Sequence, residues 1–308
     1  MANAETTSIV SASPSLLRYY HSFESRVGYR IFLGGARHYG YYPAGTFWPF
    51  PISRALRAME DQLFNSLDLV DGATVLDAGC GMGRVAIHMA RRGLRVVGID
   101  VVDHHLVEAN RNIKATGLEE QVSARKMNYH SLDGIQDESM DGVYTMETFV
   151  HANDPEKALS EFYRVLKPGG SLALHEYDHV KRGTAPGDLE AAMDKINTFA
   201  SMPANAMFDQ GFLPRMLEDV GFENVKVRDL TLNVVPMLRF FFVVAYIPFL
   251  IIRLFGLESR FINTVAGVAG YRGRKVWRYT SVAGTKPGSE VKKRGSGNSG
   301  AAGDEGAR

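Results

Sequence analysis

The chain has 308 residues, of which 45% are hydrophobic and 22% charged, and its formal net charge at pH 7 is +1. This is the composition of a folded globular protein, and a nearly neutral chain has no general field with which to hold a nucleic acid. Its single cysteine, Cys80, excludes an internal disulfide framework and argues against a cysteine-based metal site, so we expect no bound metal and a reducing, cytoplasmic location.

Both ends of the chain are small, polar and poor in apolar residues. Residues 1–13 lack a basic stretch followed by an apolar one, so we expect no secretory signal, and residues 286–308 are rich in glycine, serine and charge. Both ends are predicted to be disordered. Residues 14–70 form an N-terminal segment that is dense in aromatic residues, with a helix that Ser53 caps and that runs to about Leu67.

An alternation of apolar strands and amphipathic helices begins at residue 71. Strands are predicted at 73–77, 94–99, 122–127, 142–146 and 172–176, with helices at 84–92, 103–116 and 154–166. Gly117 is expected to cap the second of these helices, and Asp154 with Pro155 to start the third. Such repetition is typical of an α/β fold with a doubly wound, mostly parallel seven-stranded sheet and helices on both faces.

The last third of the chain adds a segment that this sheet does not need. A helix at 213–220, a strand at 225–232 and a final strand at 275–283 are predicted. The core therefore spans 71–232 and is completed by residues 273–285. Residues 233–272 are interpreted as an apolar helical cap, which roofs a substrate pocket or lies in a membrane surface through residues 237–255.

We expect no transmembrane helix in this cap. Its most apolar stretch, Phe240 to Ile252, has thirteen residues and is interrupted by Pro248. A helix needs about 20 apolar residues to cross a bilayer. The segment is therefore predicted to touch a membrane at most peripherally.

The most informative motif follows the first strand. It places Asp77 before three alternating glycines, namely Gly79, Gly81 and Gly83. Glycine lets the backbone approach a ligand closely, and ligands of such sheets bind at the carboxyl ends of the strands. The glycine spacing also admits a dinucleotide. Asp77 argues against one, because its carboxylate would repel a pyrophosphate but attract the ammonium group of a methionine moiety.

Polar residues also end the next two strands. Asp100 could accept both ribose hydroxyls of a nucleoside, and the Asn128 amide could meet an adenine edge as donor and acceptor together. Helix capping by Asp100 and turn formation by Asn128 are the structural alternatives. Cys80 is interpreted as a small residue that fits the loop beside the ligand.

With these residues, the chain resembles class I S-adenosylmethionine (SAM)-dependent methyltransferases, through DAGCGMG, Asp100, Asn128 and the LKPGG before the fifth strand. It also resembles their sterol 24-C-methyltransferase-like branch, through LLRYY, GGARHYGYYP, METFVHANDPEKALSEFYRVLKPGG and TLNVVPMLRFFFVVAYIPF. The resemblance implies SAM as the cofactor. The residues that it implies as SAM-binding are Asp77, Gly79, Gly81, Gly83, Asp100 and Asn128.

Four further residues are predicted to work beside the cofactor. In the sterol branch, the carboxylate that matches Glu147 faces a carbocation, and a carboxylate in an apolar cleft can stabilise a developing cation. His151, with a reference pKa of about 6.5, could instead remove a proton from a hydroxyl. Tyr19 and Tyr20 could present ring faces or hydroxyls to the sulfonium. Structural packing is the alternative for all four residues.

These observations favour a SAM-dependent methyltransferase that acts, on carbon or oxygen, on a small lipophilic terpenoid, sterol or polyketide-like acceptor in secondary metabolism. The alternatives are a sterol 24-C-methyltransferase proper, a non-catalytic SAM-binding scaffold and a nicotinamide-dependent oxidoreductase. Asp77 and the lack of a Tyr-x-x-x-Lys relay disfavour the oxidoreductase. A nucleic-acid methyltransferase is not expected, because no Asn-Pro-Pro-Tyr tetrapeptide follows the fourth strand.

Overall fold

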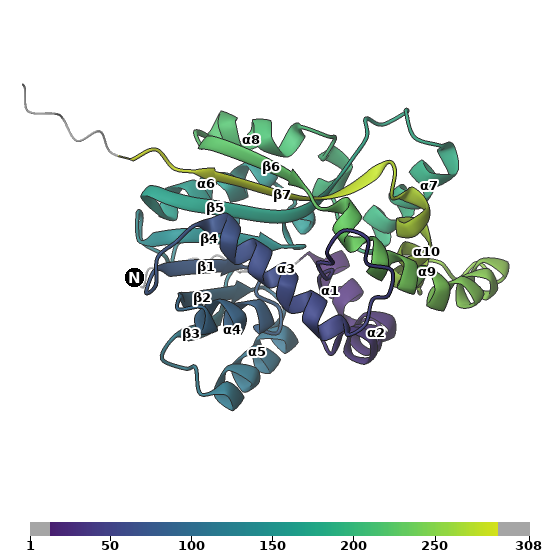
Figure 1. Ribbon diagram of the computed structural model, residues 1–308, viewed down its shortest axis with the longest axis horizontal. Helices are drawn as coiled ribbons and strands as arrows, with labels where there is room; N and C mark the ends of the chain where they lie inside the picture. Colours follow the sequence, from purple (N-terminus) through teal and green to yellow (C-terminus); the bar gives the residue numbers. More distant parts are fainter. Residues whose placement is uncertain (1–12, 289–308) are drawn as a thin grey trace, which may run out of the picture.

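The computed structural model describes residues 13–288 (Figure 1). It contains a seven-stranded sheet with the order β3-β2-β1-β4-β5-β7-β6. The strands are β1 (Thr74–Ala78), β2 (Arg95–Asp100), β3 (Val122–Lys126), β4 (Met140–Met146), β5 (Leu166–His179), β6 (Glu223–Asp229) and β7 (Trp277–Thr285). The first five strands pair in parallel, and β7 is antiparallel to both of its neighbours. The predicted fold class is confirmed.

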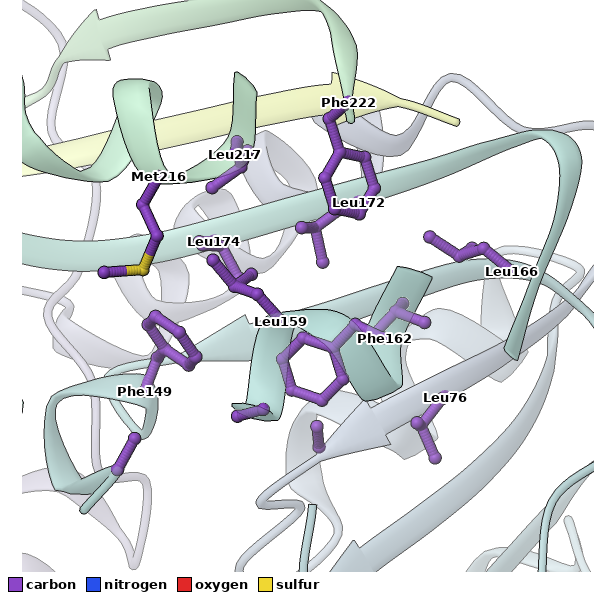
Figure 2. Close-up of a cluster of buried hydrophobic side chains, with 14 of the residues drawn as sticks. Leu76, Phe149, Leu159, Phe162, Leu166, Leu172, Leu174, Met216, Leu217 and Phe222 are labelled. Atoms are coloured by element: carbon purple, nitrogen blue, oxygen red, sulfur yellow. The ribbon is translucent and has the colours of Figure 1, made fainter. Parts of the chain in front are cut away.

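Helices cover both faces of this sheet. On one face lie α3 (Ile52–Leu67), α4 (Arg84–Arg91) and α5 (Asp103–Thr116), and on the other lie α6 (Pro155–Val165) and α8 (Phe212–Val220). Each face carries a cluster of buried apolar side chains: the first lies under α3, α4 and α5, and the second under α6 and α8. Successive residues of a strand point to opposite faces, so Val75 belongs to the first cluster and Leu76 to the second. Figure 2 shows side chains of α6, α8 and β5 gathered in the second cluster, around Phe162.

The strand order sets the position of the binding crevice. The chain first winds outward from β1 through β2 to β3, and then returns to the other side of β1 to form β4 and β5. Neighbouring loops therefore diverge at the carboxyl ends of β1 and β4, and this divergence opens a crevice. In Figure 1, α1 (Pro14–His21), α2 (Phe23–Leu33), α9 (Thr231–Leu254) and α10 (Ile262–Gly273) gather at that end of the sheet.

Local chemistry explains where several elements begin and end. Asp154 accepts a hydrogen bond from the Lys157 amide and starts α6, and Gly117 ends α5 with φ 67°, both as predicted. The structure corrects the helix predicted from Ser53, because α3 begins at Ile52 after Pro51 and Ser53 makes no cap.

Other boundaries in the second half of the chain also differ from prediction. The strand predicted at 225–232 ends at Asp229, whose carboxylate accepts the Thr231 amide and so starts α9. The fifth strand begins earlier than predicted, at Leu166. Three further helical segments of the described chain were not foreseen: α7 (Gly187–Phe199) and the 3-10 turns η1 (Phe149–His151) and η2 (Ala204–Met207).

The predicted disorder of residues 1–12 and 289–308 lies outside the described residues. Within them, Lys286 departs from the prediction, because its amide donates to the Gly170 carbonyl at 2.9 Å and its Nζ to the Leu166 carbonyl at 2.8 Å. Ser13, also predicted to be disordered, accepts the Leu17 amide at the start of α1. Hydrogen bonds with the backbone therefore hold both residues in the fold, although the composition of the two chain ends predicted disorder there.

The apolar cap before the last strand consists of α9 and α10, which pack against each other. α9 runs without a break through Pro236 and Pro248, as a helix longer than the thirteen-residue apolar stretch within it. By length and composition alone, its 24 residues could cross a membrane. Its most apolar window is 22% buried, and several of its side chains line the two compartments described below.

Candidate functional site

A pocket lies at the carboxyl ends of β1, β2 and β4, and we call it the cofactor pocket. It brings together most of the residues predicted from the motifs. Its lining includes Tyr19, Tyr20, Gly79, Cys80, Gly81, Asp100, Asn128, Glu147 and His151. Asp77 lies on β1 two residues before this lining, and Gly83 follows it as the N-cap of α4. Residues from five separate segments therefore converge on one site.

The three glycines have distinct physical roles. All three adopt positive φ, with values of 96° at Gly79, 52° at Gly81 and 74° at Gly83. A Cβ at Gly79 would overlap the Thr148 side chain, so this glycine lets the next loop pack closely. At Gly81 a Cβ would meet open space, which leaves its backbone accessible to a ligand.

Asp77 is 3% exposed, and its Oδ2 has no hydrogen-bond partner within residues 13–288. Burial raises the pKa of this carboxyl to about 7. Buried polar atoms are almost always paired. The Tyr144 hydroxyl, which also has no partner within the described residues, is near enough to act against the rise in the Asp77 pKa. The ammonium group of SAM would be a second donor, with the complementary charge.

The Asp100 carboxylate is held by three protein donors. Its Oδ1 accepts the Val102 amide, and its Oδ2 accepts the Gly81 amide and Nδ1 of His105. Burial acts to raise the Asp100 pKa, but the hydrogen bonds, first of all that from His105, lower it overall. A carboxylate has about four acceptor positions, so the ionised group keeps one for a ribose hydroxyl.

Asn128 is less free than predicted. Its Oδ1 accepts from both the amide and the ring Nδ1 of His130, at 3.0 and 2.7 Å. Both lone pairs of this oxygen are taken, so the predicted use of the amide as donor and acceptor together is wrong. The Nδ2 donor remains available to an adenine acceptor.

Arg37 is a pocket residue that sequence reasoning missed. Its guanidinium lies 4.9 Å from the ring centroid of Tyr20 and 4.8 Å from that of Tyr29, and it donates to Ser25 Oγ. Arg37 therefore already makes a cation–π contact with Tyr20. It also offers positive charge to the carboxylate of an amino-acid ligand. No local motif marks this residue, because its partners lie on α1 and α2.

His151 is fixed by hydrogen bonds on both ring nitrogens. Its Nδ1–H donates to the Ser201 carbonyl at 2.6 Å, which leaves Nε2 to accept the Tyr20 hydroxyl at 3.0 Å. Burial lowers the His151 pKa to about 4. The ring is therefore neutral at pH 7, and its one acceptor nitrogen is occupied.

Glu147 is equally engaged. It adopts φ 55°, its Oε1 accepts the Tyr39 amide at 2.6 Å and its Oε2 accepts the Tyr177 hydroxyl. Burial raises the pKa of this carboxyl, against the lowering effect of the Tyr177 hydrogen bond. Glu147 therefore joins the N-terminal segment to β5, at the boundary between the cofactor pocket and a second cavity.

Two further cavities adjoin the cofactor pocket. The apolar compartment is lined by side chains that include Phe32, Leu33, Phe241, Val244, Ala245 and Pro248. The asparagine compartment is lined by side chains that include Asn197, Asn205, Asn263 and Trp277. Tyr29 and Tyr177 line all three spaces, and Tyr39 lines the two compartments. These tyrosines mark the junction at which a substrate would meet the cofactor.

The Rossmann-like sheet, the glycine loop and the buried Asp77 together define a class I SAM-dependent methyltransferase fold. A model of the methyltransferase domain family matches residues 76–174. The chain is 42% identical to the S-adenosyl-L-methionine-dependent Diels-Alderase iccD of Talaromyces variabilis, over 93% of this chain and 100% of that protein. The chain belongs to the class I SAM-dependent methyltransferase family.

The chain is also similar to a second curated protein and to a solved structure. It is 32% identical to a sterol 24-C-methyltransferase of Eremothecium gossypii, over 57% of this chain and 46% of that protein. The crystal structure of the [4+2]-cyclase SpnF superposes with a TM-score of 0.68 at 22% identity, over 90% of this chain and 97% of that one. SAM is the cofactor of this family, so the nicotinamide-dependent alternative is set aside.

Proposed function

We propose that this protein, with SAM bound, catalyses an intramolecular [4+2] cycloaddition of a lipophilic polyene. The observation that carries the proposal is the state of the two side chains placed to handle protons. Glu147 accepts donors from the protein on both oxygens, and His151 is bonded through both ring nitrogens. A reaction that removes no proton suits this arrangement. The likeness to a named Diels-Alderase over the full length of that protein supports it.

A cycloaddition needs no external reactant. Three π bonds of a diene and a tethered alkene become two new carbon–carbon σ bonds and one π bond, and no atom, proton or electron leaves the substrate. The chief requirement is to hold a flexible chain in a folded conformation, and alignment of this kind contributes strongly to rate. The two compartments that meet at Tyr29, Tyr39 and Tyr177 can hold the two arms of a folded chain.

The junction tyrosines also offer polarisation. Burial raises the pKa values of Tyr29, Tyr39 and Tyr177, so their hydroxyls stay protonated across the physiological range. The Tyr177 hydroxyl already donates to Glu147, and the Tyr29 hydroxyl lies 3.3 Å from that of Tyr19. Of the three, the Tyr39 hydroxyl is therefore the one placed to donate to a carbonyl conjugated with the alkene and to withdraw electron density from it. When bound, SAM would supply the positive charge of its sulfonium.

Methyl transfer to a lipophilic terpenoid, sterol or polyketide-like acceptor in secondary metabolism is the second candidate. The position of Glu147 favours it, because this buried carboxylate stands where the cofactor pocket meets the apolar compartment. There it could stabilise a cation formed when an alkene accepts the methyl group. The likeness to a sterol 24-C-methyltransferase supports this alternative.

One incubation separates the two functions. The protein is mixed with methyl-labelled SAM and a synthetic linear triene that carries a tethered α,β-unsaturated carbonyl, and the products are resolved by chromatography and mass spectrometry. We expect a cyclic isomer of unchanged mass, without label, formed faster than in buffer. A labelled product accompanied by equimolar S-adenosylhomocysteine would replace the cycloaddition with methyl transfer.

We also propose that the protein works in the cytoplasm at the surface of an intracellular membrane. The outer face of α9 exposes Val243 (67%), Ile247 (63%) and Leu254 (79%). The helix contains no acidic residue, and its charges are Arg239 and Arg253. An apolar face flanked by cations is complementary to an anionic bilayer. The inner face of the same helix lines the apolar compartment, so a lipophilic substrate would enter close to the membrane.

A further inference from the structure

The asparagine compartment contains buried polar atoms that the fold leaves unpaired. Within residues 13–288, Nδ2 of Asn197, Oδ1 of Asn205, Nδ2 of Asn263 and Nε1 of Trp277 have no hydrogen-bond partner. These residues come from α7, η2, α10 and β7, and all four line the compartment. Because buried polar atoms are normally satisfied, such a convergence indicates a site for a polar ligand.

The orientation of the amides follows from the bonds that they do make. Asn205 Nδ2 donates to Asn197 Oδ1 at 2.8 Å. This bond leaves Nδ2 of Asn197 and Oδ1 of Asn205 available. Asn263 Oδ1 accepts the Tyr19 hydroxyl at 2.9 Å, so its Nδ2 remains. The free groups are therefore three N–H donor groups, on Asn197, Asn263 and Trp277, and one carbonyl acceptor, on Asn205. The Tyr279 hydroxyl, which lines the same compartment and also has no partner within the described residues, can donate or accept.

The charged residues of the wall are already paired. Arg278 bonds both oxygens of Asp178, at 2.8 and 2.5 Å. His179 has its ring nitrogens within 2.8 and 2.9 Å of backbone carbonyls. The groups left for a ligand are therefore neutral. A neutral ligand rich in carbonyl oxygens matches three donors and one acceptor, whereas a phosphate would bring uncompensated charge into a buried space.

From this arrangement we infer that the asparagine compartment binds a neutral, carbonyl-bearing head group with at least one N–H or O–H, such as an amide or lactam. The apolar compartment then receives the hydrocarbon arm of the same molecule. The two arms meet at Tyr29, Tyr39 and Tyr177, which line both compartments. The assignment deepens the proposed function, on which it rests for the polyene arm, by naming the class of head group that anchors the chain.

The first test is binding, measured by calorimetry with S-adenosylhomocysteine present. The probes are octanamide and octyl phosphate, which share a chain length and differ in the head group. We expect octanamide to bind at least tenfold more tightly than octyl phosphate. Equal affinity, tighter binding of the phosphate, or no binding of octanamide overturns the inference.

Two conservative variants locate the head group. Trp277→Phe removes the Nε1–H and keeps an aromatic ring, and Asn263→Asp keeps the oxygen that accepts from Tyr19 while removing the Nδ2 donor. Each should weaken octanamide binding about fivefold or more, the effect of one lost hydrogen bond between neutral groups. Trp48→Phe, at a residue 71% exposed, is the matched control and should leave binding unchanged. Octanamide affinity that is the same in all three variants overturns the assignment.

A spectroscopic measurement does not depend on altering the compartment. The chain has two tryptophans, so in Trp48→Phe the fluorescence comes from Trp277. Octanamide should shift this emission in a saturable manner, and an unchanged emission overturns the inference. Both tests measure binding alone. They can therefore succeed even if the reaction proves to be methyl transfer, and they can fail while the cycloaddition stands.

Discussion

The buried carboxyl of Asp77 makes cofactor affinity depend on pH. In the free protein, burial raises the Asp77 pKa to about 7, and an ammonium ligand binds the ionised form. Protons and the ligand therefore compete, and affinity is lost as the pH falls below that pKa. About one eleventh of the carboxyl is ionised at pH 6 and about ten elevenths at pH 8. The dissociation constant for S-adenosylhomocysteine should thus be about tenfold larger at pH 6 than at pH 8. This corresponds to a loss of about 1.4 kcal/mol of binding free energy.

The assay is calorimetric titration with S-adenosylhomocysteine between pH 6 and pH 8. Asp77→Asn is the control, since an amide cannot ionise and the variant should bind weakly with little dependence on pH. The same variant should unfold at a higher temperature than the wild type at pH 8 without ligand, because the folded protein no longer buries a carboxylate, whose cost is on the order of a few kcal/mol. Equal affinity of the wild type at pH 6 and pH 8 would refute the reasoning.

Three other perturbations test the packing and the surface. Gly79→Ala should unfold at a lower temperature than Gly45→Ala, because both sites have positive φ but only at Gly79 would the new Cβ overlap a threonine side chain; equal melting temperatures would contradict the close packing. Phe162→Ala should lower the free energy of unfolding by about 3–5 kcal/mol in urea titrations, as expected for a fully buried ring, and a loss below about 1 kcal/mol would show that its site collapses freely. Val243→Asp should reduce flotation with phosphatidylserine vesicles more than tenfold, from loss of an apolar contact worth about 1.5–3 kcal/mol, whereas Val107→Asp, equally exposed on α5, should not; identical flotation would rule out the α9 face as the membrane contact.

The sequence by itself determined the features that depend on neighbouring residues. The alternation of strands and helices, the capping of α6 by Asp154 and the glycine loop after β1 are all written within short windows. The carboxyl ends of parallel strands meet at one edge, so Asp77 and Asp100 could be placed beside one ligand before any coordinates were known. The prediction that Ser53 caps a helix was wrong, because serine is common in sequences and only the backbone conformation shows whether a given serine caps a helix.

The tertiary structure decided which of these groups remain free to act. Glu147 and His151 were correctly placed at the pocket, yet their partners Tyr39, Tyr177, Tyr20 and Ser201 come from distant parts of the chain. Hydrogen bonding and burial between segments far apart in sequence leave no local pattern. For the same reason, the unpaired amides of the asparagine compartment emerge only when α7, η2, α10 and β7 close around one space. Local pattern determined the cofactor site, and long-range packing determined what the site can do with a substrate.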